Sequence, residues 1–182
     1  MLIKQPTVSE SLPTLKIARS HGTDLVAINA IIKRAVMHWP MALRVRSRVV
    51  GILQYNSLDM ASYTFFSAKS DEIIMGAIAL DFEYNANDRS CKELLLHGIY
   101  VEPAAQGRGI GRTLLDFAEG QAHEHNYNSV ILRAERVSRG FFEQCGYTHS
   151  SPKTVDDYPY VYRKHLKMFP PTHHTDTKIC TP

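Results

Sequence analysis

The chain alternates between segments in which apolar residues recur every three or four positions and shorter runs rich in β-branched and aromatic residues. The first pattern is typical of helices that bury one face, and the second is typical of strands. One helix is expected from Thr23, a residue able to cap it, to about Met37, and another after Gly109. Their expected buried residues are Leu25, Ile28, Ile31, Ile32 and Ala35 in the first helix and Ile110, Leu114, Leu115, Ala118 and Ala122 in the second.

The other elements are predicted from the same patterns and from the residues that interrupt them. Trp39-Pro40 ends the first helix, and Lys69-Ser70-Asp71 separates two extended runs as a turn. Further helices are expected from about Ala42 to Tyr55 and around residues 141–147. Strands are expected at 15–20, 62–68, 72–84, 94–101, 129–133 and 158–166.

A glycine-rich turn, Gln106-Gly107-Arg108-Gly109-Ile110-Gly111, lies between a predicted strand and the second helix. Backbone N–H groups at such a turn converge on an anion, and the positive end of the helix dipole adds to the attraction. Arg108 and Arg112 add full positive charges. Residues 106–113, which include Thr113, are therefore predicted to hold a ligand that carries phosphate.

The spacing of the glycines excludes two common nucleotide sites. A dinucleotide site requires Gly-x-Gly-x-x-Gly and an acidic residue about 20 positions later. Here the third glycine position is Arg112, and the later stretch is Ser129-Val130-Ile131-Leu132. A nucleoside triphosphate loop ends in Gly-Lys-Ser/Thr, but Gly111-Arg112-Thr113 has no lysine. The turn instead matches Gln/Arg-x-x-Gly-x-Gly/Ala.

That pattern is the coenzyme A pyrophosphate motif of the GNAT family of N-acetyltransferases, which the chain resembles over residues 13–167. A second signature of the family, Phe-Tyr-Glu-Lys-x-Gly-Phe, is similar to Phe141-Phe142-Glu143-Gln144-Cys145-Gly146-Tyr147. The two motifs follow each other in the family's order and at its separation. We therefore expect an acetyltransferase domain at 13–167, an N-terminal extension at 1–12 and a mobile C-terminal tail at 168–182.

The resemblance implies an α/β fold with a mixed, mostly antiparallel central sheet flanked by helices. The fourth and fifth strands would splay apart to admit the pantetheine arm. Backbone groups of Ile99, Tyr100 and Val101 would then pair with pantetheine amides, and an N–H near Ile99 would polarise the thioester carbonyl. Gly98 indicates a bulge or a close backbone approach, or a glycine tolerated for packing. Phe142 would lie near the coenzyme sulfur.

An acceptor amine must lose a proton to attack, and His97 is the first candidate base. Because side chains alternate along a strand, Glu93, Leu95, His97 and Ile99 are expected on one face. Many family members have a base glutamate where Leu95 stands, whereas arylalkylamine acetyltransferases carry a histidine at the position of His97. Its ordinary pKa near 6.5 suits a base at neutral pH. Glu93 or water is the reserve, and a purely structural role for His97 stays open.

Two positions depart from the family pattern. Phe142 stands where a tyrosine is a frequent general acid, and it has no hydroxyl. Glu135 replaces an asparagine that usually contacts the coenzyme. Either the thiolate leaves unassisted, or another donor reaches it; the candidates are Tyr147, Tyr158 and Tyr160.

Composition is that of one globular domain: 182 residues, 44% hydrophobic and 21% charged. A net charge of +3 without a basic stripe gives no support to nucleic-acid binding, and the longest apolar run, residues 73–80, is too short to span a bilayer. Three scattered cysteines and no leader-like start favour the cytoplasm. No metal is expected, because the adjacent His173 and His174 lack further ligands.

The sequence thus predicts an N-acetyltransferase that uses acetyl-CoA as co-substrate and a primary amine of a small molecule or peptide as acceptor. The amine would attack directly in a ternary complex, in a monomer or homodimer. By the same resemblance, the site for the acceptor amine would be built from residues 37–46 and 151–160. The alternative is a non-catalytic acyl-CoA-binding or regulatory module, which Leu95, Phe142 and Glu135 favour.

Overall fold

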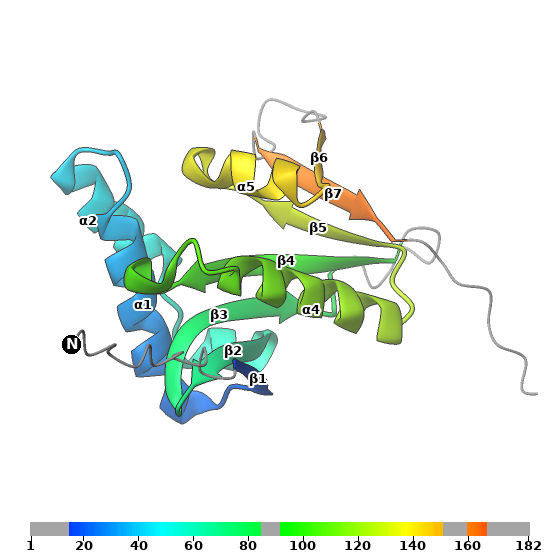
Figure 1. The fold of residues 1–182 in the computed structure, drawn as a ribbon, viewed down its shortest axis with the longest axis horizontal. Helices are drawn as coiled ribbons and strands as arrows, with labels where there is room; N and C mark the ends of the chain where they lie inside the picture. Colours follow the sequence, from blue (N-terminus) through cyan, green and yellow to red (C-terminus); the bar gives the residue numbers. More distant parts are fainter. Residues whose placement is uncertain (1–14, 85–91, 151–159, 167–182) are drawn as a thin grey trace, which may run out of the picture.

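The computed structural model describes residues 15–84, 92–150 and 160–166. The chain contains both strands and helices, as predicted for a mixed fold (Figure 1). The strands are β1 (Lys16–Arg19), β2 (Thr64–Ser70), β3 (Ile73–Asp81), β4 (Glu93–Val101), β5 (Ser129–Arg133), β6 (Thr148–Ser150) and β7 (Val161–His165). The helices are α1 (Leu25–Met37), α2 (Leu43–Leu53), α3 (Ser57–Ser62), α4 (Ile110–Glu124) and α5 (Arg139–Gln144), with 3-10 turns at Gly22–Asp24, Pro103–Ala105 and Arg136–Ser138.

These strands form one sheet in the order β1-β2-β3-β4-β5-β7-β6. Neighbouring strands are antiparallel except β4 and β5, which are parallel. Helices α1 and α4 lie on opposite faces of the sheet (Figure 1). The predicted mixed, mostly antiparallel sheet flanked by helices is confirmed.

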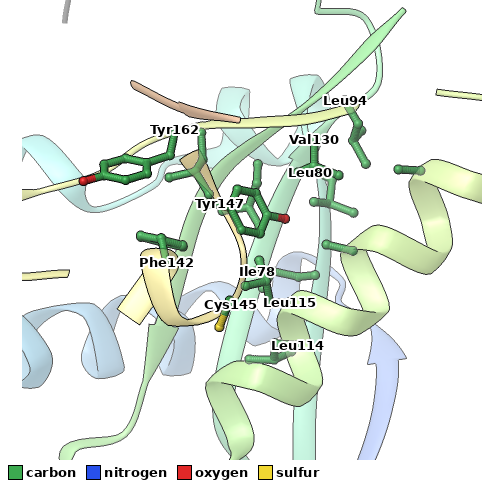
Figure 2. Packing of buried hydrophobic residues seen from close by; sticks show 14 of the residues in the cluster. Ile78, Leu80, Leu94, Leu114, Leu115, Val130, Phe142, Cys145, Tyr147 and Tyr162 are labelled. Carbon is green, nitrogen blue, oxygen red and sulfur yellow. The ribbon is translucent and has the colours of Figure 1, made fainter. Parts of the chain in front are cut away.

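Each face of the sheet has its own hydrophobic core. Side chains of β3 alternate between the two, with Ile78 and Leu80 in the larger core and Ala77 and Ala79 in the smaller core. The larger core, part of which Figure 2 shows, packs α4 and α5 onto the sheet, and the smaller core packs α1. The residues of α4 in the larger core are the five predicted from spacing: Ile110, Leu114, Leu115, Ala118 and Ala122.

The start of α1 differs from the prediction. The helix ends at Met37 as expected, but Thr23 does not cap it, because Thr23 lies inside the preceding 3-10 turn. The residue directly before α1 is Asp24, whose carboxylate accepts a hydrogen bond from the N–H of His21 at 2.9 Å within the 3-10 turn.

The hairpin turn between β2 and β3 also differs from the predicted turn at Lys69-Ser70-Asp71. Pairing continues through Ser70 opposite Ile73, so the turn is Asp71-Glu72 alone. Both turn residues have positive φ, 47° and 65°, which matches the right-handed twist of a two-residue hairpin. The expected N-terminal extension, the C-terminal tail and the acceptor segment 151–159 lie outside the described residues.

Candidate active site

The glycine-rich turn joins the end of β4 to α4. Gly107 and Gly109 have φ of 76° and 84°, the left-handed region in which a side chain is strained. Gly109 is the residue directly before α4, so the N–H groups of the first helical turn beyond it lack helical partners and face outward. The predicted anion-binding geometry, bare backbone at a helix N-terminus, is therefore present.

Side chains around the turn hold its shape. Gln106 Nε2 donates to the Val101 carbonyl at 3.2 Å, and the Thr113 hydroxyl donates to the Gly109 carbonyl at 3.2 Å. Arg112 donates to the carbonyl of Gln144 at 3.1 Å, at the end of α5. Arg112 therefore ties α4 to α5, while Arg108 is exposed on the turn itself.

Strands β4 and β5 part beside this turn. Their pairing runs from Glu93 opposite Ser129 to Leu96 opposite Leu132, while β4 continues to Val101. Figure 1 shows the two strands diverging toward the end of the sheet where the glycine turn begins α4. Among the described residues, the segment 97–101 of β4 has no strand partner on its β5 side.

The direction of the backbone groups in this segment follows from its pairing with β3. The N–H of Glu102 donates to the Met75 carbonyl at 2.8 Å, which makes these two a hydrogen-bonded pair. Such pairs alternate along an antiparallel ladder, so Tyr100 also bonds toward β3. The N–H and C=O groups of Ile99 and Val101 therefore point to the open side.

A β-bulge lies where Gly98 suggested one. Ala79 pairs with Gly98 but Leu80 pairs with Leu96, so His97 is an extra residue in β4. A Cβ on Gly98 would overlap the Tyr55 hydroxyl, and this close approach explains the glycine.

The bulge overturns the expected shared face of Glu93, Leu95, His97 and Ile99. His97 lies against Tyr55 and Tyr63, which belong to the smaller core or pack against it. Ile99 packs against the larger core, on the opposite face of the sheet. The extra residue shifts the side-chain alternation by one position, so the prediction that the Ile99 side chain shares the face of His97 was wrong.

His97 is held between two tyrosines. Its Nδ1 lies 3.1 Å from the Tyr55 hydroxyl, and its ring stacks on Tyr63 with ring centroids 4.3 Å apart. His97 is nevertheless exposed as a whole residue. Sequence reasoning missed Tyr55 and Tyr63, because neither lies near a motif and both reach His97 only through the fold.

Burial and nearby charges set the protonation of His97. Desolvation against the two tyrosines lowers its pKa below the usual 6.5, and Arg133 acts in the same direction. The carboxylates of Asp59 and Asp81 partly oppose this decrease. The net effect keeps the imidazole neutral at neutral pH, which a general base requires.

The carboxylate of Glu93, the reserve candidate for the base, is engaged in contacts between strands. Its carboxylate accepts hydrogen bonds from Arg163 Nε at 2.5 Å and from the Ser129 hydroxyl at 2.9 Å. It is 3% exposed and lies at the paired end of β4, four residues before His97. These contacts suit a residue that joins β4, β5 and β7.

We predict that Glu93→Ala will lower the free energy of unfolding by about 3 kcal/mol, because it removes the buried carboxylate to which Arg163 and Ser129 donate. Urea denaturation measures this loss. The control is Arg34→Ala, which breaks the ion pair of Arg34 with Glu102; there the Arg34 side chain is 50% exposed, so the loss should stay below about 1 kcal/mol. An inactive Glu93→Ala variant of unchanged stability would contradict this structural role.

The second signature places Phe142 in the larger core. Its side chain is 3% exposed and lies among Phe141, Tyr147 and Tyr162, as Figure 2 shows for the last two. The ring beside the glycine turn is that of Phe141, which would contact a Cβ on Gly111 at 3.2 Å. Helix α5 thus turns Phe142 inward, and Phe141 is the partly exposed ring at the turn.

Two of the three candidate tyrosines, Tyr147 and Tyr160, lie in the described part of the chain. Tyr147 is 2% exposed in the larger core, and desolvation and Glu119 raise its pKa far above the ordinary value of 10. The Tyr160 ring lies 4.9 Å from the Arg139 guanidinium, beyond the end of β5. Tyr158 lies outside the described residues.

In the predicted acceptor segment 37–46, Trp39 packs against the smaller core, and Arg46 donates to the Met37 carbonyl. Within the described ranges, no three His, Cys, Asp or Glu residues are grouped to hold a metal ion, and no helix is long and apolar enough to cross a membrane.

Comparison with solved structures shows the same fold in acetyltransferases. The structure resembles the PaiA N-acetyltransferase from Thermoplasma acidophilum in complex with coenzyme A, with a TM-score of 0.69 and 15% identity over 84% of this chain and 99% of that one. It also resembles a GNAT family acetyltransferase from Brucella melitensis in complex with acetyl-CoA, with a TM-score of 0.58 and 17% identity over 87% and 93% of the two chains. No curated protein sequence matches the chain.

A family model described as an acetyltransferase (GNAT) domain matches residues 52–161, more than half of the chain. The matched part runs from the end of α2 to the start of β7, and so includes β4, the glycine turn and α5. Membership supports acyl-CoA-dependent acetyl transfer in general. The chain therefore belongs to the GNAT family of acetyltransferases.

Proposed function

We propose that the chain is an acetyl-CoA-dependent N-acetyltransferase that acts on a primary amine of a small molecule or peptide. The observation that carries this proposal is that the glycine turn adjoins segment 97–101 of β4, whose β5 side has no strand partner in the described part of the chain. Two structural neighbours bear coenzyme A or acetyl-CoA, which supports the same co-substrate here. We assign the activity to one domain, residues 13–167, in a cytoplasmic monomer or homodimer that takes no metal and binds no nucleic acid.

The turn would bind the pyrophosphate and β4 the pantetheine arm. N–H groups from Gly107 to Arg112 can converge on phosphate oxygens, with the charge of Arg108 beside them. The outward backbone groups of Ile99 and Val101 can pair with pantetheine amides as the next strand of a sheet would. Tyr100 would contribute by holding β4 against β3, since its backbone points there.

The chemistry then needs proton removal and charge stabilisation. The acceptor nitrogen attacks the thioester carbonyl carbon, and its proton passes to His97 directly or through one water. The carbonyl oxygen takes up the negative charge, which the N–H of Ile99 stabilises. Collapse of this tetrahedral intermediate re-forms the carbonyl, breaks the C–S bond and releases the thiolate of coenzyme A. Because Phe142 carries no hydroxyl and is buried, the thiolate leaves without a side-chain acid in this scheme.

The second candidate function is a non-catalytic acyl-CoA-binding module. The apolar Leu95 and the buried Phe142, at positions where the family often has a base and an acid, favour it. The two functions differ in turnover. Thiol release from acetyl-CoA, measured across a panel of small amines and peptides, should reveal at least one acceptor. Thermal stabilisation by acetyl-CoA without release on any amine would favour the module.

We predict that Phe142→Tyr will not restore acid catalysis. Its hydroxyl would enter the larger core without a partner, so the free energy of unfolding should fall by about 1–3 kcal/mol while turnover does not rise. Thermal unfolding and thiol release measure the two quantities. Phe141→Tyr is the control, since that ring is partly exposed and should tolerate the hydroxyl. A stable, faster Phe142→Tyr enzyme would place this ring beside the coenzyme sulfur instead.

A further inference from the structure

The residue that fixes His97 comes from a part of the chain far from β4. Tyr55 lies in the short connection between α2 and α3, and its hydroxyl is 3.1 Å from His97 Nδ1. It is 7% exposed, and a buried tyrosine hydroxyl usually has a hydrogen-bond partner. The contact therefore links the connection between α2 and α3 to the candidate base on β4.

Tyr55 is held from three sides. The side chain of Asn29, on α1, clamps its backbone: Asn29 Nδ2 donates to the Tyr55 carbonyl at 2.7 Å, and the Tyr55 N–H donates to Asn29 Oδ1 at 2.9 Å. The ring packs edge-on against Phe65 at 4.8 Å, and Gly98 leaves the hydroxyl the room it needs. The hydroxyl position is thus set by the fold before any ligand binds.

We infer that Tyr55 is a positioning residue for His97: its hydroxyl engages Nδ1, so that Nε2 is the nitrogen presented to the acceptor amine. This inference rests on the proposed function. Nδ1 is engaged by Tyr55, and no described residue forms a hydrogen bond with Nε2, on a residue that is exposed as a whole. Stacking on Tyr63 prevents the ring from turning out of this orientation.

The hydroxyl suits this role throughout the reaction. Burial raises the pKa of Tyr55 well above 10, so the group stays a neutral hydroxyl. When Nε2 takes the proton from the amine, the N–H bond of the amine breaks and an imidazolium forms with a hydrogen on each nitrogen. The Nδ1–H then donates to the Tyr55 oxygen, which stabilises the charge without a carboxylate in contact.

The other groups that act on His97 are the carboxylates of Asp59 on α3 and Asp81 at the end of β3, and the guanidinium of Arg133 at the end of β5. The hydrogen bond to Tyr55 adds a directional contact to these charges. Removing it should destabilise the imidazolium and lower the pKa of His97 further. The ascending limb of the kcat profile should then move to lower pH.

The test is Tyr55→Phe, which keeps the ring and removes only the hydroxyl. We expect kcat to fall about tenfold or more, with the acetyl-CoA KM unchanged, and the ascending limb to move down in pH. The control is Tyr127→Phe, which deletes another buried hydroxyl, bonded to the Phe82 carbonyl in the larger core. It should leave both kcat and the pH profile unchanged.

A readout that needs no turnover separates this inference from the proposed function. The ¹⁵N shifts of the His97 ring should show hydrogen on Nδ1 in the neutral wild-type protein and mixed tautomers in Tyr55→Phe. Identical ring shifts and pH profiles in the two proteins, or a limb that moves up in pH, would overturn the role of Tyr55. Loss of the His97 base role alone would instead appear as an active His97→Ala variant.

Discussion

Gly109→Glu is expected to abolish the thermal stabilisation of the protein by acetyl-CoA. A glutamate at φ of 84° would strain the turn by about 1–2 kcal/mol and place a negative charge where the pyrophosphate should bind. The strain affects the turn and leaves the core intact, because no atom lies within 4 Å of the Cβ position. The variant should therefore fold, with a circular dichroism spectrum like that of the wild type.

The matched control is Gly120→Glu, inside helix α4, which begins directly after Gly109. Gly120 also has open space around its Cβ position, but its φ is ordinary and it lies in the middle of α4, away from the turn. At a ligand concentration of 100 Kd, binding stabilises a protein by about 2.7 kcal/mol, which the control should retain and Gly109→Glu should lose. Equal stabilisation of the two variants would show that coenzyme binds elsewhere.

His97→Ala is expected to lower turnover by about 100- to 10,000-fold, the usual contribution of a placed general base. The affinity for acetyl-CoA should change little, because the proposed pantetheine contacts come from the backbone of Ile99 and Val101. Steady-state kinetics at saturating amine and thermal shifts with acetyl-CoA measure the two effects. The control is His125→Ala, at the far end of α4, where the ring bonds to the Gln121 carbonyl.

The pH dependence has a definite sign. Only neutral His97 accepts a proton, so the rate rises with pH through its pKa. Because desolvation lowers this pKa, the ascending limb should lie below about pH 6.5. Above neutrality His97 is already neutral, so its titration should no longer change the rate. His97→Ala should lose this limb. Wild-type turnover and an unchanged profile in the variant would make His97 a packing residue and leave ordered water as the base.

Sequence reasoning was most reliable where the deciding interactions are local. The five buried residues of α4 repeat at helical spacing, and the glycines of the turn are required by its backbone. Gly98 even marked the bulge in β4. A glycine does not indicate which of its neighbours is the extra residue of the bulge, however. Because that residue is His97, the Ile99 side chain lies on the other face of the sheet.

The remainder of the site depends on contacts between distant segments. Tyr55 reaches His97 across 42 positions, and helix α3, which follows it, has only one clear local signal, the cap at Asn56. Strand β6 is three residues long, too short for an alternating pattern to show. The inward orientation of Phe142, toward Tyr147 and Tyr162, depends on how α5 packs on the sheet, which the family signature alone does not show.

A crystal structure with coenzyme A and an unreactive acceptor analogue tests the central claim most directly. The account predicts the pyrophosphate at the N–H groups of residues 107–112 and the pantetheine arm along Ile99 and Val101 between β4 and β5. The acceptor nitrogen should lie within hydrogen-bond reach of His97 Nε2, directly or through one water. Coenzyme bound away from the glycine turn, or an acceptor on the other side of the sheet from His97, would contradict it.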